Sequence, residues 1–226
     1  MSSDKIIKDD NDSKDDKSDK SDKSKKRRKK ESRKALFLQR FIAICIDMVI
    51  VSVFVTLFSM PFVDREEINK LNIETNDIVE KYTNNEIDLE TYSNEAMSVS
   101  YQLAKTNGIV SLITIVFSVL YFVVYQFYKG GQTIGKKIMK IKVESISGDL
   151  TINQMIFRTL IINSILLDLI NFSFMVFSSK EVYFYGVAIF EMLQYIVIIT
   201  SVFMIMYSKS ARGVHDLVAR TKVIEI

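Results

Sequence analysis

Cysteine, proline and tryptophan are almost absent from this chain of 226 residues, which contains one cysteine, one proline and no tryptophan. The cysteine, Cys45, has no second cysteine to pair with, so neither an internal disulfide nor a thiolate metal site can form within one chain. The proline, Pro61, follows a long apolar run and predicts the end of a helix. We expect no cleavable signal peptide, because the first apolar run starts only after a long hydrophilic tail and exceeds a signal-peptide core in length.

Long apolar runs dominate the chain, and 48% of its 226 residues are hydrophobic. Four runs are long enough to cross about 30 Å of hydrocarbon, at residues 36–60, 109–128, 157–178 and 182–207. Soluble buried helices rarely run this long without charges. The sequence therefore predicts an all-α fold, a polytopic membrane bundle of four transmembrane helices in contact with the lipid bilayer. Because the turn between the last two runs is very short, these should pack as an antiparallel hairpin.

Lysine and arginine are unevenly distributed between the apolar runs. They concentrate in residues 25–34, 129–158 and 209–222, whereas residues 64–107 hold ten acidic and four basic residues. With four spans the three basic segments fall on one side, and basic loops stay in the cytoplasm. We therefore expect a multi-pass protein of the cell membrane, with both termini cytoplasmic and residues 64–107 outside.

The two polar segments differ in their expected structure. Residues 1–34 consist mainly of Asp, Lys and Ser and predict a disordered cytoplasmic tail. The basic block at 25–30 favours contact with anionic lipid or acts only as a topology signal, and the lack of interleaved aromatic residues disfavours nucleic acid. Residues 64–107 lack proline and glycine and predict two amphipathic helices with a break near Asn84 and Asn85. This helical insertion is either a cap for a ligand or partner or a solvated extension.

Ionisable residues interrupt three of the four apolar runs. Arg40 and Asp47 lie seven residues apart and share one helix face, so we expect them to be linked directly or through a third group such as Asp216. Asp168 and Glu191 lie in the last two runs and predict a polar seam facing the bundle interior. The seam is either a proton or ligand path or an ordinary contact between helices.

A glycine-rich loop at 130–137 comes close to a phosphate-binding loop. Gly130, Gly135 and Lys136 match its pattern, but Lys137 stands where a hydroxyl should bind magnesium, and the loop follows a membrane helix instead of a strand. Nucleotide hydrolysis is therefore not expected. Residues 140–144 alternate in polarity and predict a short strand, so the loop and strand together form a compact cytoplasmic element.

Three motifs occur in order along the chain, at residues 39–47, at 131–136 followed by 141–143, and at 212–216 followed by 219–223. Together they resemble the motifs of the RDD family of membrane proteins, named for one arginine and two aspartates. By this resemblance the name-giving residues are Arg40, Asp47 and Asp216, and Arg158 matches an arginine before the next span. The loop motif comprises Gly131, Thr133, Gly135 and Lys136. The resemblance covers residues 35–226 with 64–107 as an insertion. It implies transport of unidentified ligands, and some members are described as sodium/proton antiporters.

Two functions remain open from the sequence. One is transport of a small ligand or exchange of cations and protons, because buried carboxylates can exchange protons near neutral pH. Four spans are few for a transporter and no pair of discontinuous helices is visible, so a homodimer would be needed to build a pathway. The other is a non-transporting scaffold or accessory subunit held by a structural ion-pair network. An enzyme is not expected, because no catalytic group, metal-ligand set or cofactor motif is present.

Overall fold

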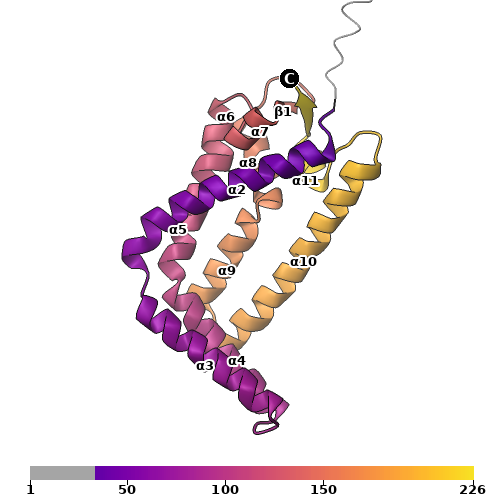
Figure 1. Ribbon diagram of the computed structural model, residues 1–226. Coiled ribbons are helices and arrows are strands. Elements are labelled where there is room, and N and C mark those ends of the chain that lie inside the picture. The colour runs from indigo at the N-terminus through magenta and orange to yellow at the C-terminus, as the bar shows by residue number, and fades with distance from the viewer. Residues whose placement is uncertain (1–33) are drawn as a thin grey trace, which may run out of the picture. The chain divides into compact units, whose positions relative to one another are not determined.

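Long apolar helices make up most of residues 34–226, the part of the chain that this computed structural model describes (Figure 1). Three are long and apolar enough to cross a membrane: α2 (Phe37–Ser59) with η1 (Met60–Phe62), the helix over Gly108–Tyr128, and α10 (Lys180–Tyr207). The predictions for the first, second and fourth spans are confirmed, and α2 ends two residues before Pro61. The tail over 1–33 and its basic block at 25–30 lie outside the described residues.

The third predicted span is not one straight helix. It consists of α8 (Ile152–Ile162) and α9 (Ile165–Phe177), which are bent by 67° at Asn163 and Ser164. Ser164 has a φ of +56°, in the left-handed region that cannot continue a right-handed helix. The prediction of a continuous helix over 157–178 is therefore wrong, and this span is one discontinuous helix among residues 34–226. Hydropathy continues across the bend and carries no signal of the backbone change.

The second span also changes its helical form. It begins as α5 (Gly108–Val119), becomes the π-helical stretch η2 (Leu120–Tyr125) and ends as α6 (Gln126–Tyr128). Such π-helical segments are frequently found at functional sites. Here the stretch contains Tyr121, whose hydroxyl reaches α2, and Phe122, whose carbonyl accepts a hydrogen bond from Thr159 of α8. It therefore joins the second span to both of its neighbours.

The two expected amphipathic helices are α3 (Arg65–Thr83) and α4 (Leu89–Thr106), and Asn85 lies in the turn between them with a φ of +58°. Their buried faces form a small core of their own, made of Leu71, Ile78 and Val99. This hairpin also packs against the spans, since α4 contacts α9 and α10 and the Tyr101 hydroxyl donates to the Ser178 carbonyl at 2.8 Å. It is therefore more than a solvated extension.

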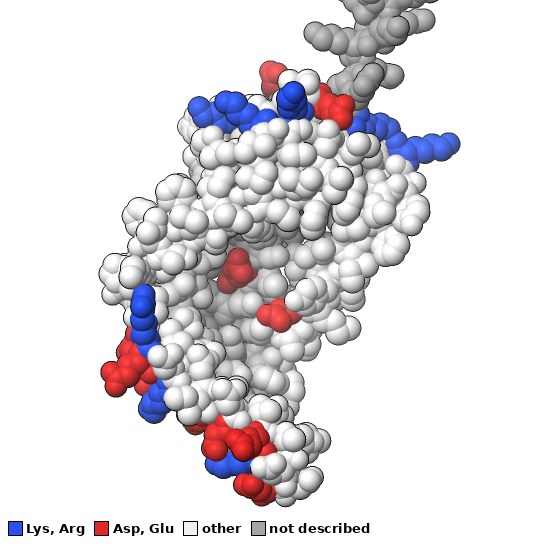
Figure 2. Space-filling model, viewed as in Figure 1, with Lys and Arg blue, Asp and Glu red and all other residues white. Residues whose placement is uncertain are grey.

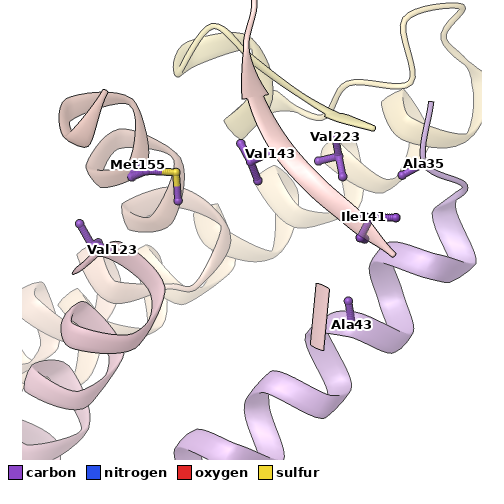
Figure 3. Packing of buried hydrophobic residues seen from close by; sticks show 7 residues of the cluster. All are labelled: Ala35, Ala43, Val123, Ile141, Val143, Met155 and Val223. Atoms are coloured by element: carbon purple, nitrogen blue, oxygen red, sulfur yellow. The ribbon is translucent and has the colours of Figure 1, made fainter. Parts of the chain in front are cut away.

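A two-stranded antiparallel sheet lies at the end of the bundle where α2 begins and α10 ends (Figure 1). The predicted strand is β1 (Ile141–Ser145), and it pairs with β2 (Thr221–Glu225), which sequence reasoning missed. Short helices precede each strand: α7 (Ile134–Ile138) and α11 (Val214–Val218). Figure 3 shows the apolar cluster that attaches this element to the spans, formed by Ala35, Ala43, Val123, Ile141, Val143, Met155 and Val223.

Candidate functional site

Asp216, at the start of α11, is the centre of a buried network of charges. Its side chain is fully buried, and its Oδ2 accepts from Arg40 Nη1 at 3.1 Å. Its Oδ1 accepts from Arg158 Nη1 of α8 and from the Thr221 hydroxyl of β2 at 3.2 Å. One carboxylate therefore joins α2, α8, α11 and β2. The expected polar site did not include Arg158. Two signals pointed to it: it is an arginine beside an apolar run, and it matches an arginine of the family.

Asp47, the other acidic residue of the first span, occupies a separate and fully satisfied position. It is fully buried and accepts three hydrogen bonds: from the Tyr121 hydroxyl at 2.7 Å, the Thr133 hydroxyl at 2.5 Å and the Gly135 backbone N–H at 2.8 Å. Thr133 and Gly135 belong to the loop that resembles a phosphate-binding loop. The anion that this loop holds is thus a carboxylate of its own chain.

The expected link between Arg40 and Asp47 is not present. Arg40 contacts Asp216 and the Val223 carbonyl, whereas Asp47 contacts η2 and the loop before α7. Seven residues of helix separate the two by about 10.5 Å along the axis. Arg40 has acceptors closer to it than Asp47, and Asp47 has donors closer to it than Arg40. Asp216 also does not bridge them, because its described partners do not include Asp47.

Lys136 and His215 are two further buried ionisable groups near these clusters, with exposed fractions of 8% and 2%. Burial and the neighbouring Arg158 lower the pKa of Lys136 to about 7, and Asp47 partly opposes this shift. Burial and the charges of Arg158, Arg40 and Lys136 lower the pKa of His215 far below its usual range. His215 is therefore neutral, and its contact with Asp216 is not a pair of full charges.

Asp168 lies half-buried in α9 and lines a cavity of about 250 Å³ between α4, α5, α9 and α10. Asn171 lines the same cavity, and its Oδ1 is buried without a hydrogen-bond partner among the described residues. Glu191 is exposed on α10 and does not line this cavity. Of the two carboxylates expected in an interior seam, Asp168 therefore lines the cavity and Glu191 does not.

Gln194, three residues after Glu191, makes the contact between α10 and the broken span. Its Nε2 donates to the Ile161 carbonyl at 2.9 Å and to the Ser164 hydroxyl at 3.1 Å. The Ile161 carbonyl lies in the last turn of α8, where a helix leaves its carbonyl groups unpaired. Gln194 therefore stabilises the bend that separates α8 from α9.

The Asp216 cluster, the Asp47 cluster and the Asp168 cavity differ in what they can do chemically. Asp216 and Asp47 have well-placed donors, so protonating either would break several buried contacts. Asp168 has no lysine or arginine within ion-pair distance in the described part of the chain. No group of histidine, cysteine or acidic side chains suited to hold a metal ion is found within residues 34–226.

Comparison with known proteins agrees with the motifs. The model of the RDD family matches residues 34–220. This range includes the charged residues of both clusters, the loop before α7 and the Asp168 cavity. No curated protein and no solved structure gives a significant match to the chain.

Proposed function

The chain belongs to the RDD family of membrane proteins, and from this premise we propose that it exchanges protons or small cations across the membrane, with Asp168 as the exchanging group. The observation that carries the proposal is a carboxylate without a basic partner in a cavity between four helices, whose lining includes the oxygen-bearing side chains of Ser111, Thr114 and Asn171. Ionisable residues within membrane spans are costly and usually belong to ion or proton pathways.

The polar groups around Asp168 present hydrogen-bond acceptors. The hydroxyls of Ser111 and Thr114 line the cavity, and each already donates to the backbone carbonyl four residues before it. Their lone pairs therefore remain for a ligand. Asn171 also lines the cavity, and its buried Oδ1 has no hydrogen-bond partner among the described residues. Oxygen acceptors beside a carboxylate suit a proton or a hard cation and disfavour an anion.

The bend in the third span supports the same proposal. Discontinuous helices form the ion sites of many secondary transporters, because the break frees backbone groups and provides a point of movement. Asp168 lies in the first turn of α9, immediately after the bend at Ser164. A change in the contact between Gln194 and the bend would move Asp168 relative to α10.

A scaffold or accessory role is the second candidate, and the saturation of the two clusters favours it. Arg40, Arg158 and Asp216 lock the sheet end to α2 and α8, and Asp47 locks the loop before α7. A rigid surface at one end of the bundle would suit binding of another protein. The flux experiment below separates the two functions.

Replacing Asp168 by asparagine should abolish proton-coupled cation flux while leaving the fold intact, because asparagine keeps the shape of the side chain but cannot ionise. The measurement uses the full chain in liposomes that contain a pH-sensitive dye, with a sodium or potassium gradient across the membrane. Glu191→Gln is the matched control, since it makes the same chemical change on an exposed position, and should retain flux. Equal flux in Asp168→Asn and the wild type would refute the proposed role, and a folded but silent wild-type protein would favour the scaffold.

We also propose that the sheet end faces the cytoplasm. Figure 2 shows lysine and arginine concentrated at that end and most acidic side chains at the end of α3 and α4. In a Cys45→Ser background, cysteine placed at Asn85 should react with an impermeant maleimide added outside intact cells, and cysteine placed at Ser210 should react only after the cells are opened. Labelling of the Ser210→Cys variant in intact cells would reverse the proposed orientation.

A further inference from the structure

A second cavity, of about 320 Å³, lies among α2, α8, α10 and the sheet end of the bundle. Because α2 packs on α5 and α7 while α10 packs on α9, α4 and α11, the cavity occupies space between α2 and α10. Its volume falls within the range of small-ligand sites. It contains none of the residues that line the Asp168 cavity.

The walls of this cavity combine an apolar side with a basic end. Most lining side chains are apolar, including Phe37, Phe41 and Ile44 of α2 and Ile198, Val202 and Ile205 of α10. The basic end consists of Arg40, Lys136 and Arg158, and no carboxylate lines the cavity.

The charges at the basic end are not balanced. Three cations, Arg40, Lys136 and Arg158, stand against two carboxylates, Asp47 and Asp216, which leaves one positive charge when Lys136 is protonated. Both arginines bind Asp216, and Asp47 is satisfied by other donors. The Lys136 ammonium has neither a hydrogen-bond acceptor nor an acidic group within ion-pair distance among residues 34–226, although only 8% of this residue's surface is exposed. A buried cation without a partner is costly, and a bound anion would remove that cost.

The position of the cavity connects it with the membrane surface. Phe37 and Arg40 lie in the first turn of α2, and Ile205 lies two residues before the end of α10, so both helices contribute their sheet-side ends. Helix ends of spans lie at the depth of lipid headgroups. Phe41 lines the cavity while 53% of its surface is exposed, so the apolar wall continues onto the outer surface of the bundle.

We infer that this cavity binds an amphiphilic anion, whose phosphate or carboxylate group contacts Lys136, Arg40 and Arg158 and whose hydrocarbon part lies between α2 and α10. A headgroup oxygen can accept from Lys136 without displacing Asp216 from the arginines. The ligand is either an anionic lipid of the bilayer or a soluble fatty-acid-like anion, which share this chemistry. The residues of this site are other than those of the basic block at 25–30. Its ligand is an anion, whereas the ligand proposed at Asp168 is a proton or a cation.

The absence of tryptophan permits a direct test. Phe41→Trp places a single fluorophore on the cavity wall, and the full chain is studied in nanodiscs that contain dibrominated phosphatidylglycerol or dibrominated phosphatidylcholine. The expected result is preferential quenching by phosphatidylglycerol, with a relative association about fivefold higher than that of phosphatidylcholine. Lys136→Gln should remove this preference, and Lys136→Arg, which keeps the charge, should retain it. Lys137→Gln is the matched control on the exposed neighbouring residue and should also retain it.

A second arm identifies the source of the anion. Decanoate is added to the Phe41→Trp protein in phosphatidylcholine nanodiscs and in brominated phosphatidylglycerol nanodiscs, with decanol as the uncharged control. If decanoate relieves the quenching and raises the unfolding temperature, and decanol does neither, the site is open to soluble amphiphiles. Preference for phosphatidylglycerol without competition by decanoate supports a lipid site. The inference is overturned if neither phosphatidylglycerol nor decanoate gives a response. It is also overturned if Lys136→Gln and Lys137→Gln lose the preference for phosphatidylglycerol equally, because the preference would then come from surface charge only.

Discussion

Replacing Asp216 by asparagine is expected to lower the free energy of unfolding by about 3–5 kcal/mol, because the change leaves two buried guanidinium groups without their counter-charge. Asp216 is fully buried, and Arg40 and Arg158 are 7% and 6% exposed, so water cannot take over the role of the carboxylate. Asparagine has nearly the same shape, which limits the effect to the charge. Thermal unfolding of the purified full chain in a mild detergent, followed by circular dichroism, measures the loss.

The control for this prediction is Asp149→Asn, the same chemical change on an exposed turn after β1. It should leave the unfolding temperature close to that of the wild type, since exposed charges contribute little. Combining Asp216→Asn with Arg158→Gln should recover part of the lost stability by removing one uncompensated cation. Equal unfolding temperatures for the Asp216 and Asp149 variants would show that the buried network does not hold the sheet end to the spans.

Replacing Gly135 by alanine is expected to destabilise the protein by about 3 kcal/mol, because there is no space for a methyl group between α7 and α2. A Cβ at this position would lie 2.2 Å from the Ala43 carbonyl oxygen and 2.8 Å from Asp47 Oδ1. The carbonyl belongs to the backbone of α2 and cannot move aside alone. The two helices must separate, which also breaks the hydrogen bond from the Gly135 N–H to Asp47.

Gly108→Ala is the matched control for this steric effect. A Cβ there would meet only the flexible end of Met175, with its Cε at 3.2 Å, so a small rotation of that side chain relieves the contact. Thermal unfolding should show a large decrease for Gly135→Ala and a small one for Gly108→Ala. Similar decreases in the two variants would contradict the close packing of α7 on α2.

Spans and amphipathic helices could be predicted because each depends on residues close together in the chain. Transfer of an apolar helix into lipid sums the contributions of its own side chains, so three spans appeared near their observed bounds. The break between α3 and α4 at Asn85 and the strand β1 followed from local spacing in the same way. The bend at Ser164 escaped detection, because one residue with a left-handed backbone does not alter the hydropathy of its neighbours.

The partners of the charged residues could not be predicted in the same way. Arg40, Asp47 and Asp216 were singled out as costly charges and through a family resemblance, yet the expected link between Arg40 and Asp47 is replaced by two separate clusters. The partner of Asp47 is a loop 86 to 88 residues further along the chain, and the partner of Arg40 lies 176 residues away. Spacing along α2 placed both residues on one face but did not indicate which distant donor would reach each of them.

By itself the sequence determined that this chain enters a membrane, approximately where it crosses, and which side chains are too costly to face lipid. These outcomes follow from transfer free energies of single residues, which do not depend on the rest of the fold. Only the tertiary structure decided that Asp216 binds two arginines, that Asp47 holds the glycine-rich loop, that β2 pairs with β1, and that Asp168 faces a cavity while Glu191 is exposed. Each of these depends on which distant segments pack together, and packing is set by the fit of many side chains at once.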